Sequence, residues 1–233
     1  MSKGVALITG VGPGTGASLV RKFAADGYQV AMIARNAERL ARLADETPGA
    51  YAFPADVCDL DQFEGAIGKV ESTLGAPTVV VHNAVGGVFG NFMDIEPSVL
   101  ARNFDVNVMA LLNLARRVSP AMVQAGKGAI VVTGNTSALR GRAHFAGFAP
   151  TKAAQRILAE SIARELGPKG VHVAYVVIDA VIDVEWARKR NPEASDDFFI
   201  KPEDIAAEVL HIAHQPRSAW SFTVEIRPFA EKW

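Results

Sequence analysis

The sequence predicts an α/β fold in which helices cover both faces of a parallel β-sheet. Short apolar runs rich in β-branched residues, typical of buried strands, alternate with longer stretches that carry apolar residues at helical spacing. Alternation of this kind favours right-handed crossovers and parallel pairing of the strands. The chain has 233 residues, of which 49% are hydrophobic, and it contains no linker, repeat or low-complexity segment. We therefore expect residues 1–233 to form a single domain.

The predicted elements alternate from the amino terminus onward. The expected strands are residues 5–8, 29–34, 79–81, 130–132 and 171–178. The expected helices are residues 17–26, 37–45, 60–74, 97–125 and 153–166. Segment 183–200 differs, because it is polar yet holds Trp186, Phe198 and Phe199. Such a composition fits a surface helix pair with a few core anchors, and it also fits a mobile substrate flap over a cleft.

The composition excludes several classes of function. Lys and Arg number 24 against 25 Asp and Glu, whereas a dedicated nucleic-acid binder carries a basic domain. The single cysteine, Cys58, cannot form an internal disulfide, so nothing calls for an oxidising compartment. The first apolar run is too short for a secretory leader, and the uncharged stretch 76–93 is broken by Pro, Gly and Asn. We expect a cytoplasmic protein with no membrane span, no nucleic-acid partner and no metal site.

A glycine-rich loop follows the first predicted strand and precedes the first helix. Residues 9–16 read Thr-Gly-Val-Gly-Pro-Gly-Thr-Gly. Glycines let backbone N–H groups approach a pyrophosphate, which then lies at the positive end of the helix. A glycine-rich turn without a ligand is the alternative, but each glycine costs about 0.5–1 kcal/mol where alanine would serve. We expect a dinucleotide site with contacts from Thr9, Gly10, Gly14, Thr15 and Gly16.

The end of the second predicted strand bears on the choice of cofactor. An acidic residue there would bind both hydroxyls of the adenosine ribose and would repel a 2′-phosphate. The sequence has Ala34-Arg35-Asn36 instead. The planar guanidinium of Arg35 suits a phosphate, and an arginine that merely caps a surface loop is the alternative. We expect NADP(H) to be favoured over NAD(H).

At this point the order of motifs resembles the short-chain dehydrogenase/reductase family, from Lys3 to Ile226. The glycine loop has that family's spacing. The other matching residues are Asp56 and Val57 at the adenine, Asn83 and Ala84 after the fourth strand, and Asn107 in the proton relay. The resemblance implies a Rossmann-type, doubly wound sheet of seven parallel strands and a nicotinamide cofactor. It also implies a homodimer or homotetramer formed through helices 97–125 and 153–166.

The family's catalytic signature is a serine followed by Tyr-x-x-x-Lys, and this chain departs from it. The matching stretch runs from Phe148 to Lys152, so the lysine is kept while the tyrosine hydroxyl is absent. By ungapped spacing the family serine falls on Asn135, with Ser137 two residues later. This substitution and the tail that runs from Gln215 through Arg227 and Pro228 resemble a subset of the family that carries Phe at the tyrosine position.

The remaining site residues follow from this resemblance and from their chemistry. The catalytic candidates are Asn107, Asn135, Ser137 and Lys152. Lys152 would hold the nicotinamide ribose, Asn135 would donate to a developing alkoxide, and Ser137 would relay a proton. The backbone N–H of Ile182 would bind the carboxamide. The substrate-pocket candidates are Phe148, Asp179 and Trp186, with a turn-forming role as the alternative for Asp179.

Together these residues predict an oxidoreductase that transfers hydride between NADP(H) and a small alcohol or carbonyl compound by a proton path without tyrosine. One alternative is an NADP(H)-binding sensor or regulatory protein without turnover. Another is an enzyme that uses bound cofactor for isomerisation or elimination. The glycine loop fits all three, whereas the retained Asn107 and Lys152 favour the oxidoreductase.

Overall fold

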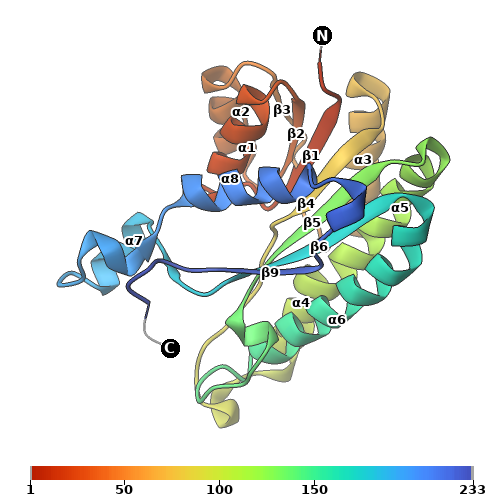
Figure 1. Ribbon diagram of the computed structural model, residues 1–233. Helices are drawn as coiled ribbons and strands as arrows, with labels where there is room; N and C mark the ends of the chain where they lie inside the picture. Colours follow the sequence, from red (N-terminus) through yellow and green to blue (C-terminus); the bar gives the residue numbers. More distant parts are fainter. Residues whose placement is uncertain (1, 232–233) are drawn as a thin grey trace.

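The computed structural model describes residues 2–231, and its centre is a parallel sheet of seven strands (Figure 1). The strand order is β3-β2-β1-β4-β5-β6-β9, and all neighbours pair in parallel. The strands are β1 (Val5–Thr9), β2 (Gln29–Ile33), β3 (Ala50–Ala52), β4 (Pro77–His82), β5 (Gly128–Asn135), β6 (Val171–Ile178) and β9 (Thr223–Ile226). The expected Rossmann-type sheet is confirmed.

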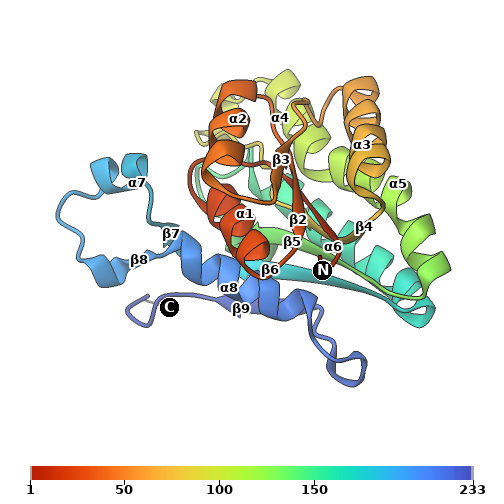
Figure 2. The ribbon, with the colours of Figure 1, turned by 90° about the horizontal axis from the view of Figure 1, so that it is seen from above.

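Helices cover both faces of this sheet (Figure 2). One face packs against α1 (Thr15–Ala25), α2 (Ala37–Glu46) and α8 (Pro202–Ala213). The other face packs against α3 (Leu60–Leu74), α5 (Ala110–Ala125) and α6 (Ala149–Leu166). All residues of β1 and β6 are consequently buried, which explains why these strands are continuous apolar runs in the sequence.

The strand order reverses between β1 and β4. From β1 the chain builds outward through β2 to β3, and then returns to place β4 on the opposite side of β1. The helices that connect β1 to β2 and β4 to β5, α1 and α5, lie on opposite faces, so a crevice opens at the carboxyl ends of β1 and β4. Ligands of doubly wound sheets bind in such crevices.

Three elements of the central sheet and its helical layers were not predicted from the apolar patterns, namely β3, β9 and α8. Strand β3 has only three residues, and β9 is an edge strand in which exposed residues alternate with half-buried ones. Neither forms a continuous apolar run. Helix α8 was absent from the expected helices although Ile205, Val209 and Ile212, all fully buried, have helical spacing.

The helix expected over residues 97–125 is not regular. Helix α4 (Pro97–Phe104) continues into a π-helical turn at Asp105–Met109, and α5 follows directly. A π-turn accommodates one additional residue in the helix and is frequent at functional sites. Here the turn carries Asn107, whose side chain is fully buried.

Residues 181–200 form a small unit that projects from one end of the molecule in Figures 1 and 2. Strand β7 (Val181–Ile182) pairs in parallel with β8 (Phe199–Ile200), and α7 (Glu185–Arg190) lies between them in the chain. Arg188 braces this unit, because its guanidinium donates to both oxygens of Asp183 at 2.7 Å and to Asp196 at 2.6 Å. The same guanidinium lies 4.3 Å from the centre of the Phe199 ring. Contacts of Arg188 within the segment therefore stabilise the region for which a flap was one interpretation.

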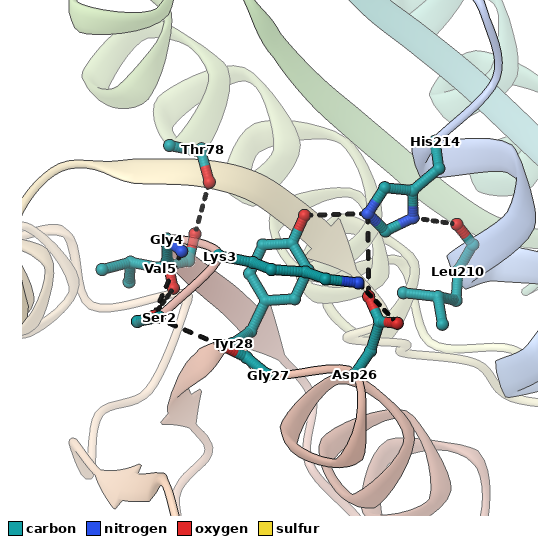
Figure 3. Close-up of polar contacts among 10 residues, drawn as sticks. All are labelled: Ser2, Lys3, Gly4, Val5, Asp26, Gly27, Tyr28, Thr78, Leu210 and His214. Carbon is teal, nitrogen blue, oxygen red and sulfur yellow. Dashed lines mark hydrogen bonds and ion pairs between the residues drawn. The ribbon is translucent and has the colours of Figure 1, made fainter.

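A polar cluster joins the start of the chain to the ends of α1 and α8 (Figure 3). Lys3 Nζ lies 2.9 Å from Asp26 Oδ1, and Tyr28 Oη lies 3.0 Å from His214 Nε2. His214 Nδ1 is 2.8 Å from the carbonyl oxygen of Leu210. Because a carbonyl only accepts, Nδ1 carries the proton of the neutral ring, and the Tyr28 hydroxyl donates to Nε2. The cluster thus fastens the last turn of α8 to the end of α1.

Within residues 2–231, none of the helices combines the length and the apolar character needed to cross a membrane.

Candidate active site

The glycine loop packs so closely that two positions exclude any side chain. Gly10 has φ +72°, and a Cβ there would lie 2.4 Å from the Cα of Ala84. A Cβ on Gly16 would lie 2.7 Å from the Cα of Val11. Glycine alone permits both the left-handed backbone and these contacts. The loop therefore brings the end of β1 directly against the segment that follows β4.

Helix α1 begins after this loop with polar groups that lack partners. Its N-cap residue, Gly14, provides no side chain to accept from the first N–H groups of the helix. The hydroxyl of Thr15 is buried and has no hydrogen-bond partner among the described residues. An unsatisfied buried polar group costs about 1–3 kcal/mol. A pyrophosphate at the helix amino terminus would satisfy these donors, so these residues fit a dinucleotide.

A cavity of about 1000 Å³ extends from this loop along the carboxyl ends of the central strands. Most of the predicted cofactor residues line it, namely Gly10, Gly14, Thr15, Gly16, Arg35, Asp56, Val57, Asn83, Ala84 and Ile182. Trp186, predicted for the substrate pocket, lines the same cavity and is 62% exposed. The volume is in the range of small-molecule and cofactor sites.

Seven predicted site residues lie outside the lining of this cavity, namely Thr9, Asn107, Asn135, Ser137, Phe148, Lys152 and Asp179. The side chain of Thr9 is fully buried, and its hydroxyl lies 3.1 Å from Nδ1 of His82 on β4. Thr9 therefore connects β1 to β4, and its contact with the cofactor stays a prediction. Asp179 follows β6, and its N–H donates to the carbonyl of Ile226 at 2.9 Å. This bond continues the pairing of β6 with β9, and both interpretations of Asp179 stay predictions.

The end of the cavity beside β2 is rich in guanidinium groups. Arg35, Arg39 and Arg102 all line it, and Arg102 Nη2 lies 3.1 Å from Asp56 Oδ2. Burial opposes the effect, but a hydrogen bond from the backbone N–H of Cys58 and the charges of Arg102 and Arg35 lower the pKa of Asp56. Sequence reasoning missed Arg39. It stands three residues after Asn36, the N-cap of α2, in the first turn of that helix.

Asn83 connects the ends of the central strands. Its Nδ2 donates to the carbonyl of Gly10 at 2.9 Å, and its Oδ1 accepts from the hydroxyl of Thr133 at 2.9 Å. The side chain therefore links the glycine loop to β5 across the crevice. Its position after β4 is the one predicted from the sequence.

The end of β7 and the residues that follow it lie against the glycine loop. Both Ile182 and Val184 line the cavity, and a Cβ on Gly14 would lie 2.6 Å from Val184 Cγ1. The 181–200 unit therefore contributes one wall of the cavity, with Trp186 at its exposed margin.

Lys152 is nearly completely buried, with 2% of its surface exposed. Its Nζ donates to the carbonyl of Thr133 at 3.2 Å and to Oε1 of Gln155. No carboxylate among residues 2–231 forms an ion pair with it in the structure. Burial without a compensating charge lowers the pKa of Lys152 to about 7. Such a group is able to hold or release a proton near neutral pH.

Asn107 has all of its side-chain groups engaged. Its Oδ1 accepts from the N–H of Gly86 at 3.0 Å, and its Nδ2 donates to Gly86 O at 2.7 Å and to Thr151 Oγ1 at 2.8 Å. These bonds join the π-turn, the loop after β4 and the first turn of α6. The contacts of the side chain are those of a residue that positions its neighbours.

Phe148 occupies the position expected for the family tyrosine. It is the N-cap residue of α6, is 6% exposed, and its ring lies 5.2 Å from the Phe89 ring, centre to centre. A Cβ on Gly87 would lie 2.6 Å from Phe148 Cδ2, so Gly87 admits the ring. Lys152 N–H donates to Phe148 O at 3.2 Å, which confirms that the two residues are one helical turn apart.

Asn135 and Ser137 lie at the end of β5, close to α6. Asn135 Oδ1 accepts from the backbone N–H of Ser137 at 3.1 Å. This bond uses the amide oxygen and leaves the Nδ2 hydrogens without a partner among the described residues. The 3₁₀ turn Thr136–Ala138 packs against α6. An amide donor and a hydroxyl therefore lie at the end of β5, beside α6.

Tyr175 is the aromatic hydroxyl nearest to Lys152, and sequence reasoning did not single it out. It is fully buried on β6, and Lys152 Nζ lies 6.0 Å from its ring centre. Burial raises the pKa of Tyr175 despite the charge of Arg156. A hydroxyl with these surroundings is a poor acid at neutral pH, so Tyr175 does not replace the missing tyrosine.

Fold and site together define a nicotinamide-dependent oxidoreductase, and known proteins agree. A family model described as short chain dehydrogenase matches residues 4–194. The chain belongs to this family. It is 31% identical to L-xylulose reductase of Cavia porcellus over 217 residues, which cover 89% of this chain and 87% of the relative.

Two further proteins extend the comparison. The chain is 29% identical over 219 residues to carbonyl reductase [NADPH] 2 of Sus scrofa, covering 89% of this chain and 87% of that protein. A metagenomic short-chain oxidoreductase solved in complex with NADP superposes with a TM-score of 0.86 at 27% identity, and the match covers 99% of each chain.

Proposed function

We propose that this protein is an NADP(H)-dependent reductase of a small carbonyl compound, with a proton path that does not use tyrosine. It would belong to a subset of the family in which Phe148 stands at the tyrosine position. The observation that carries the proposal is a dinucleotide cavity lined by Gly87, against which the Phe148 ring packs one helical turn before the buried Lys152. The similar proteins from Sus scrofa and Cavia porcellus are named as reductases of carbonyl compounds, which supports this substrate class.

The residues that would hold the cofactor divide along the cavity. The glycine loop and the start of α1 would bind the pyrophosphate, Asp56 and Val57 the adenine, and Lys152 the nicotinamide ribose. The backbone N–H of Ile182 would bind the carboxamide. When bound, the reduced nicotinamide supplies a hydride to the carbonyl carbon of the substrate.

The oxygen of the reduced carbonyl then needs a proton. Asn135 offers amide N–H groups that stabilise the developing alkoxide, but an amide is not a useful acid. Lys152 is the proton source in this proposal, either directly or through the hydroxyls of Ser137 and Thr136. The buried site supports this role, because burial brings the pKa of Lys152 to about 7, close to the operating pH.

A direct test measures the oxidation of NADPH by carbonyl compounds and, separately, the binding of NADPH. NADPH oxidation would be followed over a panel of small aldehydes and ketones, beside a fluorescence titration of NADPH binding in which Trp186 serves as a reporter at the margin of the cavity. We expect binding and turnover with at least one carbonyl class. Tight binding with no oxidation over any carbonyl would overturn the proposal in favour of an NADP(H) sensor.

Arg35→Ala is expected to weaken the binding of NADPH while leaving that of NADH nearly unchanged. Arg35 and Arg39 line the same end of the cavity. The strand end there carries Ala34 instead of an acidic residue that would repel a 2′-phosphate. A hydrogen bond to a charged group contributes about 1.5–3 kcal/mol, so the NADPH preference should be roughly ten- to a hundredfold in the wild type. Dissociation constants from calorimetry provide the measurement. Arg42→Ala, on the following helix α2 and outside the cavity lining, serves as the control. Equal constants for both cofactors in the wild type would contradict the assignment.

We also propose that the chain forms a homodimer or homotetramer through α4, α5 and α6. Apolar side chains at the surface of this helical region support the proposal, since Ile157 is 58%, Met109 45% and Val99 40% exposed. Closed symmetric oligomers bury such faces isologously. Light scattering at micromolar concentration should give a dimer or tetramer mass, and Ile157→Glu should lower it. A wild-type monomer would contradict the proposal.

A further inference from the structure

Gln155 lies one turn after Lys152 on α6 and is fully buried. Its Oε1 accepts from Lys152 Nζ and from the hydroxyl of Tyr175 at 3.3 Å. Its Nε2 donates to the backbone carbonyl of Asn107 at 2.7 Å. One amide therefore connects the buried lysine, the central strand β6 and the π-turn. The fold keeps a costly buried polar side chain here and satisfies it.

The orientation of this amide is determined by its partners. An ammonium group only donates and a backbone carbonyl only accepts. A flipped amide would place its N–H groups against Lys152 and its oxygen against the carbonyl of Asn107. Only one orientation is compatible with both neighbours, so Gln155 presents an acceptor oxygen to Lys152.

The hydrogen bonds of Lys152 leave one of its three donors free. The carbonyl of Thr133 and Oε1 of Gln155 take the other two. The titratable groups that face Lys152 are Tyr175 on β6 and His82 on β4. Burial and the charge of Lys152 lower the pKa of His82 to about 3, so His82 is neutral at pH 7. The two hydrogen-bond acceptors of the ammonium, Thr133 O and Gln155 Oε1, are both uncharged.

We propose that Gln155 is a positioning residue for Lys152. It fixes the ammonium against the Thr133 carbonyl, leaves one N–H for the cofactor or substrate, and contributes no charge that would hold the proton on the lysine. This inference deepens the proposed function, because it assumes that Lys152 serves the reduction.

The side-chain amide also restricts where the proton goes. In the reduction, the hydride forms a C–H bond at the carbonyl carbon, the oxygen gains one proton, and Lys152 changes from ammonium to amine. The amine then recovers a proton from water. Gln155 does not pass this proton toward Asn107, because its Nε2 only donates and its Oε1 would first have to become an imidic acid. Lys152 therefore exchanges protons only on the side away from Gln155.

The test follows Lys152 by NMR in protein labelled with ¹³C at the lysine ε-carbons. The Lys152 signal is assigned by its loss in Lys152→Met. Wild type should titrate near neutral pH. In Gln155→Glu, which keeps the shape but adds a negative charge, the titration should move upward by one to three pH units. Tyr175→Phe, which removes the other donor to the same oxygen and keeps the ring, is the matched control and should shift it by less than about half a unit.

A second arm measures the pH dependence of NADPH oxidation. Its basic limb should move upward in Gln155→Glu together with the NMR titration, and Gln155→Leu, which has no acceptor, should move it downward. Shifts of the basic limb in opposite directions in Gln155→Glu and Gln155→Leu would show that Gln155 acts on the charge of Lys152. A residue that only packs against Lys152 would change the rate and leave the limb in place. Should the Leu variant fail to fold, the Glu variant alone still decides.

The two arms separate this inference from the proposed function. A Lys152 titration that stays in place in Gln155→Glu, or that moves equally in Tyr175→Phe, overturns the role of Gln155 whatever the enzyme does. A titration that moves as expected supports it even in protein that oxidises no NADPH. In that case the proposed function fails and the positioning of Lys152 stands.

Discussion

Replacing Phe148 with tyrosine is expected to accelerate the reduction of an activated carbonyl by up to roughly 10²–10⁴-fold, the contribution of a positioned general acid. The ring should keep its place, because Phe148 is 6% exposed and is enclosed by Phe89 and Gly87. Phe148 lies one helical turn before Lys152, and a positive charge lowers the pKa of a neighbouring phenol. Single-turnover hydride transfer with bound NADPH is the measurement, since it separates chemistry from binding and product release.

Two variants control this experiment. Lys152→Ala in the Phe148→Tyr background should remove the gain, because the phenol would lose the charge that acidifies it. Phe145→Tyr adds a hydroxyl to a neighbouring ring, 5.0 Å from Phe89, and should leave the rate unchanged. A wild type that is faster than Phe148→Tyr would show that the site already uses another proton donor. The interpretation that Phe148 only fills the space of the family tyrosine would then be wrong.

Lys152→Met is expected to change how the stability of the fold depends on pH. The lysine titrates near 10.5 in the unfolded chain and near 7 in the folded one. Between these values the unfolded state binds more protons, so the free energy of unfolding rises with pH. Below pH 7 the fold carries a buried ammonium, and methionine removes that cost.

The expected magnitude follows from the same shift. The stability of Lys152→Met relative to wild type should fall by about 4 kcal/mol as the pH is raised from 6.5 to 10. The lost hydrogen bonds to Thr133 and Gln155 add an offset that does not alter this trend. Urea unfolding at several pH values provides the measurement, with the exposed Lys169→Met as the control. Parallel curves for the Lys152 variant and wild type would contradict a buried lysine that is neutral above pH 7.

Both experiments address one property of the site. Burial makes Lys152 unfavourable for stability at neutral pH and useful for moving a proton there. Functional sites often destabilise the fold that contains them. The expected loss of activity and gain of stability in Lys152→Met at low pH would be two results of the same buried charge.

The sequence was sufficient to predict the parallel sheet, the glycine loop and the position of Phe148 relative to Lys152. Each depends on local chemistry. Strands β1 and β6 are buried on both faces and therefore read as apolar runs, whereas the short edge strands β3 and β9 do not. Gly10 and Gly16 were recognisable because a dinucleotide loop needs glycine at a fixed spacing.

Only the tertiary structure decided which polar side chains meet. Thr9 belongs to the predicted glycine motif, yet its hydroxyl contacts His82, 73 residues away in the chain. Gln155 is an ordinary helical residue in the sequence, and its role emerges from carbonyl, ammonium and hydroxyl groups contributed by α6, β6 and the π-turn. Backbone conformation follows largely from neighbouring residues, but the partner of a buried polar group depends on how distant segments pack. For that reason the sequence by itself determined the fold, the dinucleotide loop and the absence of the tyrosine, while the surroundings of Lys152 were decided by packing.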